Sequence, residues 1–177
     1  VLDYFYYDYN IVSFKESVKK VMDFECDGLL FAPIFHEDSV RFLKEYKKKN
    51  IPVVMIDSNI SDNNEYAYVG QDAFQSGYLA GRLISFAVKN ERHVLIFKIT
   101  QEIESTSVYL QRIKGFYSFF EDNDELTNFK FSEVTLKDSK IEELNLEMFS
   151  EISSIFVPNS RAYIAAQFLE QNNIKGI

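Results

Sequence analysis

The chain has 177 residues, 46% of them hydrophobic, so it is long enough to bury one large core or two smaller ones. Its formal net charge of −8 indicates that this piece lacks the basic surface that binding to nucleic-acid phosphates requires. No run approaches the roughly 18 apolar residues of a membrane span, the single cysteine cannot form an intrachain disulfide, and the two histidines lie too far apart to suggest a metal site.

The sequence opens with a strand, a helix and a second strand, which is the pattern of a crossover unit. Residues 1–9 are rich in aromatic side chains, which favours a strand. Ser13 and Glu16 form a capping box, so we expect a helix that begins at Ser13 and ends at Phe24. The apolar run over residues 28–32 is typical of a strand that is buried on both faces.

The same unit is then repeated. We expect Asp38 to cap a helix that runs to Lys48, followed by a buried strand over residues 51–57 and a polar loop that begins at Ser58. The inward positions of this helix are predicted to be Val40, Leu43 and Tyr46. Its lysines are interpreted as a solvated face and not as a contact to nucleic acid.

A short extended run reaches Asp72 and turns at once into a helix that continues to about Val88. Asp72 and Gln75 form a second capping box, and this role alone would explain the carboxylate. However, ligands of open α/β sheets bind beyond the carboxyl ends of the strands, so a carboxylate at such a junction is also a candidate ligand contact.

The rest of the chain continues the alternation of strands and helices. The expected strands are 93–97, 129–134, 154–158 and the beginning of one at 174–177, and the expected helices are 108–120, one from Asp138 through Met148, and 161–171. A polar run near residue 90 predicts a boundary between an N-terminal lobe, residues 1–90, and a C-terminal lobe, residues 91–177. The pattern predicts an α/β fold with doubly wound parallel sheets.

Two motifs, VGQDAFQSGYLA from Val69 and RIKGF from Arg112, occur in this order with one expected strand between them. They resemble the motifs V-G-x-D-N-x-x-x-G-x-x-A and R-x-x-G-F of the LacI/GalR repressors and the type I periplasmic sugar-binding proteins. The resemblance implies two lobes of the type I periplasmic-binding-protein-like fold. Because the chain begins at Val1 and stops inside an expected strand, we expect it to be truncated at both ends.

The resemblance also implies that a sugar or small polar metabolite is held in a cleft between the lobes. Asp72, Arg112 and Asn159 align with residues that would hydrogen-bond its hydroxyls or a carboxylate. Phe35 and Ser58 follow two other strands and are further candidate contacts, Phe35 by stacking on a sugar ring. The structural alternatives are a solvated helix arginine for Arg112, a turn or cap residue for Asn159, and a core residue for Phe35.

The chain departs from the family pattern at two positions near the expected cleft. Ala73 stands where the family has asparagine after the aspartate, and Ser160 stands where it has aspartate after the asparagine. Both departures remove a polar group, which leaves the identity of the ligand open.

The sequence therefore leads to the hypothesis of an effector-binding domain of a bacterial, cytoplasmic LacI-type transcriptional regulator. Its expected partners are a carbohydrate effector, a second copy in a homodimer, and DNA only through a helix-turn-helix in a missing N-terminal domain, with no membrane contact. The alternative is a periplasmic or lipid-anchored sugar-binding protein of a transport system. No motif for a phosphate-binding loop, a dinucleotide or a nucleophile elbow is present, so we expect neither enzymatic activity nor a cofactor.

Overall fold

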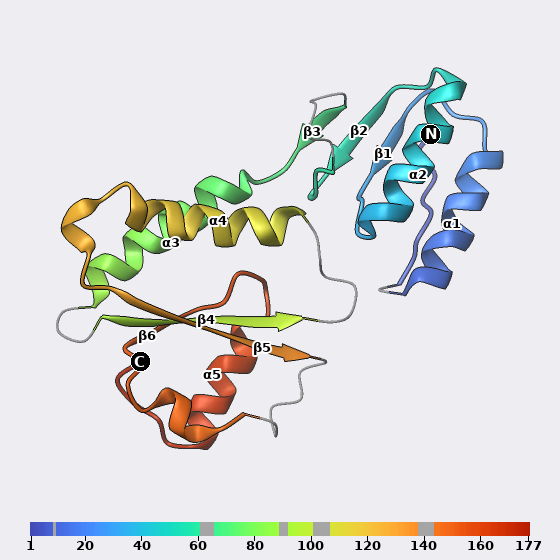
Figure 1. Cartoon of the computed structure of the whole chain (residues 1–177). Coiled ribbons are helices and arrows are strands. Elements are labelled where there is room, and N and C mark those ends of the chain that lie inside the picture. Colours follow the sequence, from blue (N-terminus) through green and yellow to red (C-terminus); the bar gives the residue numbers. More distant parts are fainter. Residues whose placement is uncertain (9, 61–65, 89–91, 101–106, 138–143) are drawn as a thin grey trace. The chain divides into compact units, whose positions relative to one another are not determined.

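The computed structural model describes residues 1–8, 10–60, 66–88, 92–100, 107–137 and 144–177 (Figure 1). The chain forms two compact units. The first comprises the described residues of Val1–Gln71 and Ile103–Val108, and the second comprises those of Asp72–Glu102 and Tyr109–Ile177. No helix in the described part of the chain combines the length and the apolar character needed to cross a membrane.

The first unit is a three-stranded parallel sheet with two helices packed against it. The strand order is β1-β2-β3, and Leu29 of β1 lies opposite Val53 of β2. The elements are α1 (Ile11–Asp23), β1 (Leu29–Phe31), α2 (His36–Tyr46), a 3-10 turn η1 (Lys47–Lys49), β2 (Val53–Ile56) and β3 (Ala67–Val69). The core is aromatic: the rings of Phe14, Phe31 and Phe42 are buried and pack in series, tilted or edge to face, from α1 through β1 to α2.

Three predictions for the first unit are corrected by the structure. Residues 1–8 form no strand, because none of the described strands pairs with them, although Phe5 and Tyr7 still pack on the core. The cap of α1 is Asn10 and not Ser13: the Asn10 side chain accepts a hydrogen bond from the Ser13 N–H at 2.8 Å. The strand predicted to be buried on both faces leaves Leu30 63% exposed.

The second helix of this unit is also rotated relative to the prediction. It begins at His36 and not at Asp38, and Val40 points outward with 42% exposure. The buried positions Ser39, Phe42, Leu43 and Tyr46 follow the i, i+3, i+4, i+7 spacing of one helix face. Leu43 and Tyr46 are buried as predicted, and Phe42 is buried in place of Val40.

The second unit is a parallel sheet covered by helices on both faces. The strand order is β5-β4-β6, with β4 (His93–Thr100) paired with β5 (Lys130–Lys137) along its whole length and with β6 (Ser154–Phe156). The helices are α3 (Ala73–Ala87), α4 (Ser107–Glu121) and α5 (Ala162–Gln171), with 3-10 turns η2 (Asp124–Leu126) and η4 (Leu146–Phe149).

Successive side chains of β4 point to opposite faces of the sheet and so belong to two different cores. Leu95 and Phe97 belong to the core shared with α5, whereas Val94 and Ile96 belong to the core shared with α3 and α4. Accordingly, α3 and α4 lie on one side of the sheet and α5 on the other (Figure 1). Parallel strands with helices on both faces confirm the predicted fold class.

The end of the second unit differs from the predicted pattern. Of the helix expected from Asp138, residues 138–143 lie outside the described part, and the described remainder is a 3-10 turn from Leu146 to Phe149. The strand expected at residues 174–177 is not formed, but Ile174 and Ile177 pack on the core beside α5.

The predicted lobe boundary near residue 90 does not coincide with the division of the structure, which falls between Gln71 and Asp72. The physical reason is the contact between α3 and α4. A Cβ on Gly77 would lie 1.9 Å from the carbonyl oxygen of Arg112, so the backbones of the two helices touch. Asp72 and Arg112, which were expected in different lobes, are therefore in the same unit.

Candidate functional site

Arg112 and Asn159 are brought together at the carboxyl ends of β4 and β6. Arg112 Nη1 donates a hydrogen bond to the carbonyl oxygen of Pro158 at 3.1 Å. Asn159 Nδ2 donates one to the carbonyl oxygen of Ile99, near the end of β4, at 2.7 Å. Two residues from distant parts of the sequence thus meet at the edge of the sheet where ligands of α/β proteins bind.

The amide of Asn159 also shapes the turn between β6 and α5. Its Oδ1 accepts a hydrogen bond from the backbone N–H of Arg161 at 3.1 Å, whereas Arg161, the N-cap residue, makes no side-chain cap bond of its own. The turn role considered for Asn159 is therefore present in the structure. Ser160, which replaces the aspartate of the family pattern, is exposed.

Asp72 lies at the same edge of the second unit. Gly77 of α3 approaches Arg112, and Gly81 approaches Phe116 and Phe119, so the contacts advance together and the two helices run in the same direction. Since α4 follows the carboxyl end of β4, the amino ends of both helices lie at this edge. The exposed side chain of Asp72 accepts a hydrogen bond from the Gln75 N–H at 2.9 Å, which confirms the predicted cap.

Phe35 and Ser58 belong to the first unit. Phe35 is only 6% exposed, and its ring centroid lies 5.0 Å from that of Phe14, so the ring is part of the core of this unit. Ser58 is half-buried in a tight turn after β2, where its N–H donates to the carbonyl oxygen of Ile56 at 2.7 Å and the preceding Asp57 has a φ of 65°. A ligand role for either residue remains a prediction.

The clearest electrostatic cluster of the second unit lies on β4, β5 and α4. Glu133 accepts hydrogen bonds from Lys98 and, at 2.7 Å, from the Tyr117 hydroxyl. The bond from Lys98 holds the pKa of Glu133 below its usual value, against the opposing effect of partial burial. Burial raises the pKa of Tyr117, and the bond to Glu133 raises it further. These groups form a hydrogen-bonded chain on the face of the sheet.

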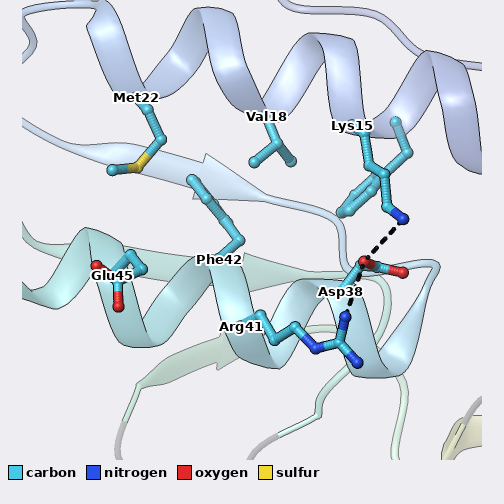
Figure 2. Close-up of a pocket in the computed structure, with 8 residues that line it drawn as sticks. Lys15, Val18, Met22, Asp38, Arg41, Phe42 and Glu45 are labelled. Carbon is cyan, nitrogen blue, oxygen red and sulfur yellow. Dashed lines mark ion pairs between the residues drawn. The ribbon is translucent and has the colours of Figure 1, made fainter.

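A groove lies between α1 and α2 in the first unit (Figure 2). Its floor is apolar, formed by Val18, Met22 and Phe42, and at one end Asp38 pairs with Lys15 at 3.4 Å and, from the same helix as Asp38, with Arg41 at 3.8 Å. None of the predicted ligand residues lines this groove, so it is separate from the predicted site. Among the described residues, no three histidine, cysteine, aspartate or glutamate side chains gather closely enough to hold a metal ion.

Sequence reasoning missed two parts of the site. The carbonyl of Pro158 holds Arg112, and no residue pattern could identify a backbone acceptor that is remote in sequence. Gly115 was noted only as part of the R-x-x-G-F motif, whereas in the structure it is the place where α4 touches the backbone of α3 at Phe74. The spacing of three residues between Arg112 and Gly115 places them on one face of a helix, and this was the only sequence signal for the contact.

A family model described as a periplasmic binding protein domain matches residues 5–177. No curated protein sequence gives a significant match. Among solved structures, a candidate LacI transcriptional regulator from Bacteroides fragilis is similar, with a TM-score of 0.83 and 26% sequence identity over 97% of this chain and 61% of that chain.

Two sugar-binding proteins share the fold. A glucose-galactose binding protein from Geobacillus stearothermophilus has a TM-score of 0.73 and 23% identity, over 93% of this chain and 59% of that chain. The periplasmic component of an ABC-type sugar transport system from Hahella chejuensis has a TM-score of 0.77 and 22% identity, over 93% of this chain and 61% of that chain. The chain thus spans less than two thirds of the length of each of these three structures.

Proposed function

Because this chain belongs to the family of periplasmic binding protein domains, we propose that it is the effector-binding domain of a LacI-type transcriptional regulator and binds a sugar or sugar-like molecule. The observation that supports a regulator is the similarity to the B. fragilis protein, whose TM-score of 0.83 and identity of 26% exceed those of the two sugar-binding proteins above. The proposed effector site is the edge of the second unit that carries Asp72, Arg112 and Asn159.

The chemistry of these three side chains suits a polyhydroxylated ligand. The guanidinium of Arg112 donates in a rigid fork, the carboxylate of Asp72 accepts from hydroxyl pairs, and the amide of Asn159 both donates and accepts. Phe35 and Ser58 of the first unit are proposed as further contacts. The hydrogen bond from Arg112 to Pro158 would hold the guanidinium group in one orientation before the ligand binds, which lowers the entropy cost of binding.

The proposal extends to the complete protein. Because the net charge of −8 does not suit contact with DNA phosphates, DNA binding is assigned to a segment outside this sequence. The regulator is proposed to act in the cytoplasm as a homodimer. Obligate dimer interfaces are large and apolar, so the complete protein should keep the mass of a dimer when light scattering is measured at micromolar concentration. A monomeric mass under these conditions would contradict the homodimer.

The second candidate is a sugar-binding protein of a transport system. It is favoured by the similarity to the G. stearothermophilus and H. chejuensis proteins, each over 93% of this chain. Both candidates share a fold, and the fold alone does not separate them.

The deciding experiment measures sugar and DNA binding in the full-length protein. Calorimetric titration with a panel of mono- and disaccharides identifies the effector, and a mobility-shift assay with the promoter DNA of its own operon tests DNA binding with and without that sugar. A regulator should bind the DNA, and the sugar should change its affinity. Sugar binding without any DNA binding would favour the transport protein.

Arg112→Ala tests the site itself. Loss of a hydrogen bond to a charged group costs about 1.5 to 3 kcal/mol, so sugar affinity should fall by roughly tenfold to more than a hundredfold. Lys114→Ala is the matched control, because Lys114 is an exposed residue on the same helix. Equal affinity of Arg112→Ala and the wild type would mean that Arg112 does not contact the sugar.

A further inference from the structure

The helices α3 and α4 cross in direct backbone contact at two glycines. A Cβ on Gly77 would lie 1.9 Å from the carbonyl oxygen of Arg112, and a Cβ on Gly115 would lie 2.0 Å from the carbonyl oxygen of Phe74. Real Cβ contacts are essentially never shorter than 3.0 Å, so only a hydrogen atom fits at either position. The contact is reciprocal, because Phe74 and Gly77 are three residues apart on one face of α3, as are Arg112 and Gly115 on α4.

The close approach is confined to the part of the crossing that carries Arg112. At Gly81, one turn further along α3, the nearest atoms to a Cβ would be Phe119 Cβ at 3.0 Å and the Phe116 carbonyl oxygen at 3.1 Å. Those distances can be relieved by shifts of a few tenths of an ångström. Shifts of that size cannot relieve a Cβ at Gly77 or Gly115, since it would lie only 1.9 or 2.0 Å from a backbone oxygen.

Packing prevents α4 from moving away as a rigid body. Phe116 is fully buried, and its ring stacks on that of Phe156 in β6 with centroids 4.5 Å apart. Tyr78 of α3 packs edge-on against Phe119 of α4 at 5.3 Å. The position of the Arg112 backbone is therefore set by the absence of a side chain at Gly77, while the position of its guanidinium is set by the 3.1 Å bond to Pro158.

We propose that Gly77 and Gly115 are positioning residues for Arg112, which they hold at the depth where its guanidinium can reach both the β6–α5 turn and a ligand. The inference rests on the proposed ligand role of Arg112. Relief of a 1.9 Å contact to the 3.0 Å limit displaces the backbone at residue 112 by about 1 Å. A shift of that size lengthens the bond to Pro158 beyond hydrogen-bonding distance and moves the guanidinium out of the geometry that binding requires.

The test compares Gly77→Ala and Gly115→Ala with the matched control Gly81→Ala in the full-length protein. Sugar affinity from calorimetry should fall at least tenfold in the first two variants and stay within about twofold in the control, because a Cβ would meet backbone oxygens at 1.9 and 2.0 Å in the first two and its nearest atoms only at 3.0 to 3.1 Å in the control. Wild-type affinity in both Gly77→Ala and Gly115→Ala would overturn the inference. Failure of both variants to fold would also overturn it, because that result would show a general structural role.

A double-mutant cycle separates positioning from a general loss of structure. If Gly77 acts through Arg112, the variant Gly77→Ala/Arg112→Ala should bind sugar no more weakly than Arg112→Ala alone. Additive losses in the double variant would show that Gly77 acts by another route and would overturn the proposal.

A measurement on the ligand-free protein tests the position of Arg112 independently of whether the protein binds sugar. In ¹⁵N spectra of the arginine guanidinium groups, the Arg112 signal, assigned by its loss in Arg112→Lys, should shift in Gly77→Ala and Gly115→Ala but not in Gly81→Ala. If the wild-type protein binds no sugar of the panel and the signal shifts in this way, the proposed function fails and the positioning role stands. An unchanged Arg112 signal in both variants would overturn the positioning role.

Discussion

Asp72 occupies the amino end of α3, where its side chain accepts the Gln75 N–H at 2.9 Å. Asparagine caps helices about as well as aspartate, whereas alanine costs about 1 kcal/mol. We therefore expect Asp72→Ala to destabilise the second unit by about 1 kcal/mol in urea unfolding, and Asp72→Asn to leave its stability nearly unchanged. Asp122→Ala, at an exposed position after α4, is the control and should have little effect. Equal stability of Asp72→Ala and the wild type would contradict the cap.

The same pair of Asp72 variants separates capping from ligand binding. A capping role alone predicts that Asp72→Asn changes neither stability nor sugar affinity. A ligand role predicts a weaker affinity at unchanged stability, because the amide cannot accept at both of its terminal atoms. Calorimetric titration of Asp72→Asn with the effector distinguishes the two.

Glu133 should make a pH-dependent contribution to stability. Its pKa in the folded protein is lowered, first by the bond from Lys98, so its ionised form stabilises the fold above the unfolded-chain pKa of about 4.3, and this contribution is lost as the pH falls through the folded pKa. Because the Glu133 side chain is 41% exposed, Glu133→Gln should cost less than about 1 kcal/mol at pH 7. The difference from the wild type should shrink towards zero in acid.

The measurement is urea unfolding of wild type and Glu133→Gln from pH 7 down to pH 3. Glu121→Gln, at an exposed position on α4, serves as the control because no bond to Lys98 or Tyr117 is lost. A cost of Glu133→Gln that grows as the pH falls would contradict the assigned direction of the pKa shift.

Phe116 anchors α4 in the core of the second unit. Phe116 is fully buried between the sheet and α3, with Phe156, Phe131 and Phe120 around it. Phe116→Ala should therefore destabilise the second unit by about 3 to 5 kcal/mol, through lost burial and the cavity that remains. The control is Leu110→Ala on the same helix, because Leu110 is 58% exposed. A cost below about 1 kcal/mol for Phe116→Ala would show that this core can collapse around the gap.

The elements that the sequence predicted well are those whose signal is local. The apolar runs of β2 and β6 and the cap at Asp72 that begins α3 all depend on neighbouring residues. The errors have tertiary causes. Residues 1–8 have strand composition, yet a strand needs a paired backbone, and none of the described strands pairs with them. The cap of α1 is Asn10 and not the expected Ser13, whose hydroxyl accepts the Asp8 N–H instead.

The candidate site was predictable only in part, for a similar reason. Asp72, Arg112 and Asn159 could be selected because motifs and strand ends are visible in the sequence. Their assignment to two lobes failed, because the contact of Gly77 with Arg112 joins α3 to the second unit, and small residues in a helix do not reveal which helix they will meet. The burial of Phe35 beside Phe14 likewise depends on packing between α1 and α2.

At the scale of the whole molecule, the two units have separate hydrophobic cores. The first core is formed by residues between Phe5 and Tyr68, and the cores of the second unit by residues between Ala80 and Ile177. No described residue belongs to the core of both units. Since cooperativity comes mainly from shared burial, each unit should open as its own cooperative element.

Hydrogen exchange of the full-length protein tests this independence with one substitution in each core. Phe42 is 5% exposed and packs on Phe31 and Tyr46, so Phe42→Ala should speed amide exchange in β1 and β2 while β4 and β5 keep their rates. Phe116→Ala should do the reverse. Each substitution removes about 3 to 5 kcal/mol from its own unit, which is a rate increase of more than a hundredfold for amides that exchange by opening of that unit. Equal acceleration across both sheets by either substitution would mean that the units unfold together, and the stabilities of the Asp72, Glu133 and Phe116 variants would then have to be assigned to the whole chain.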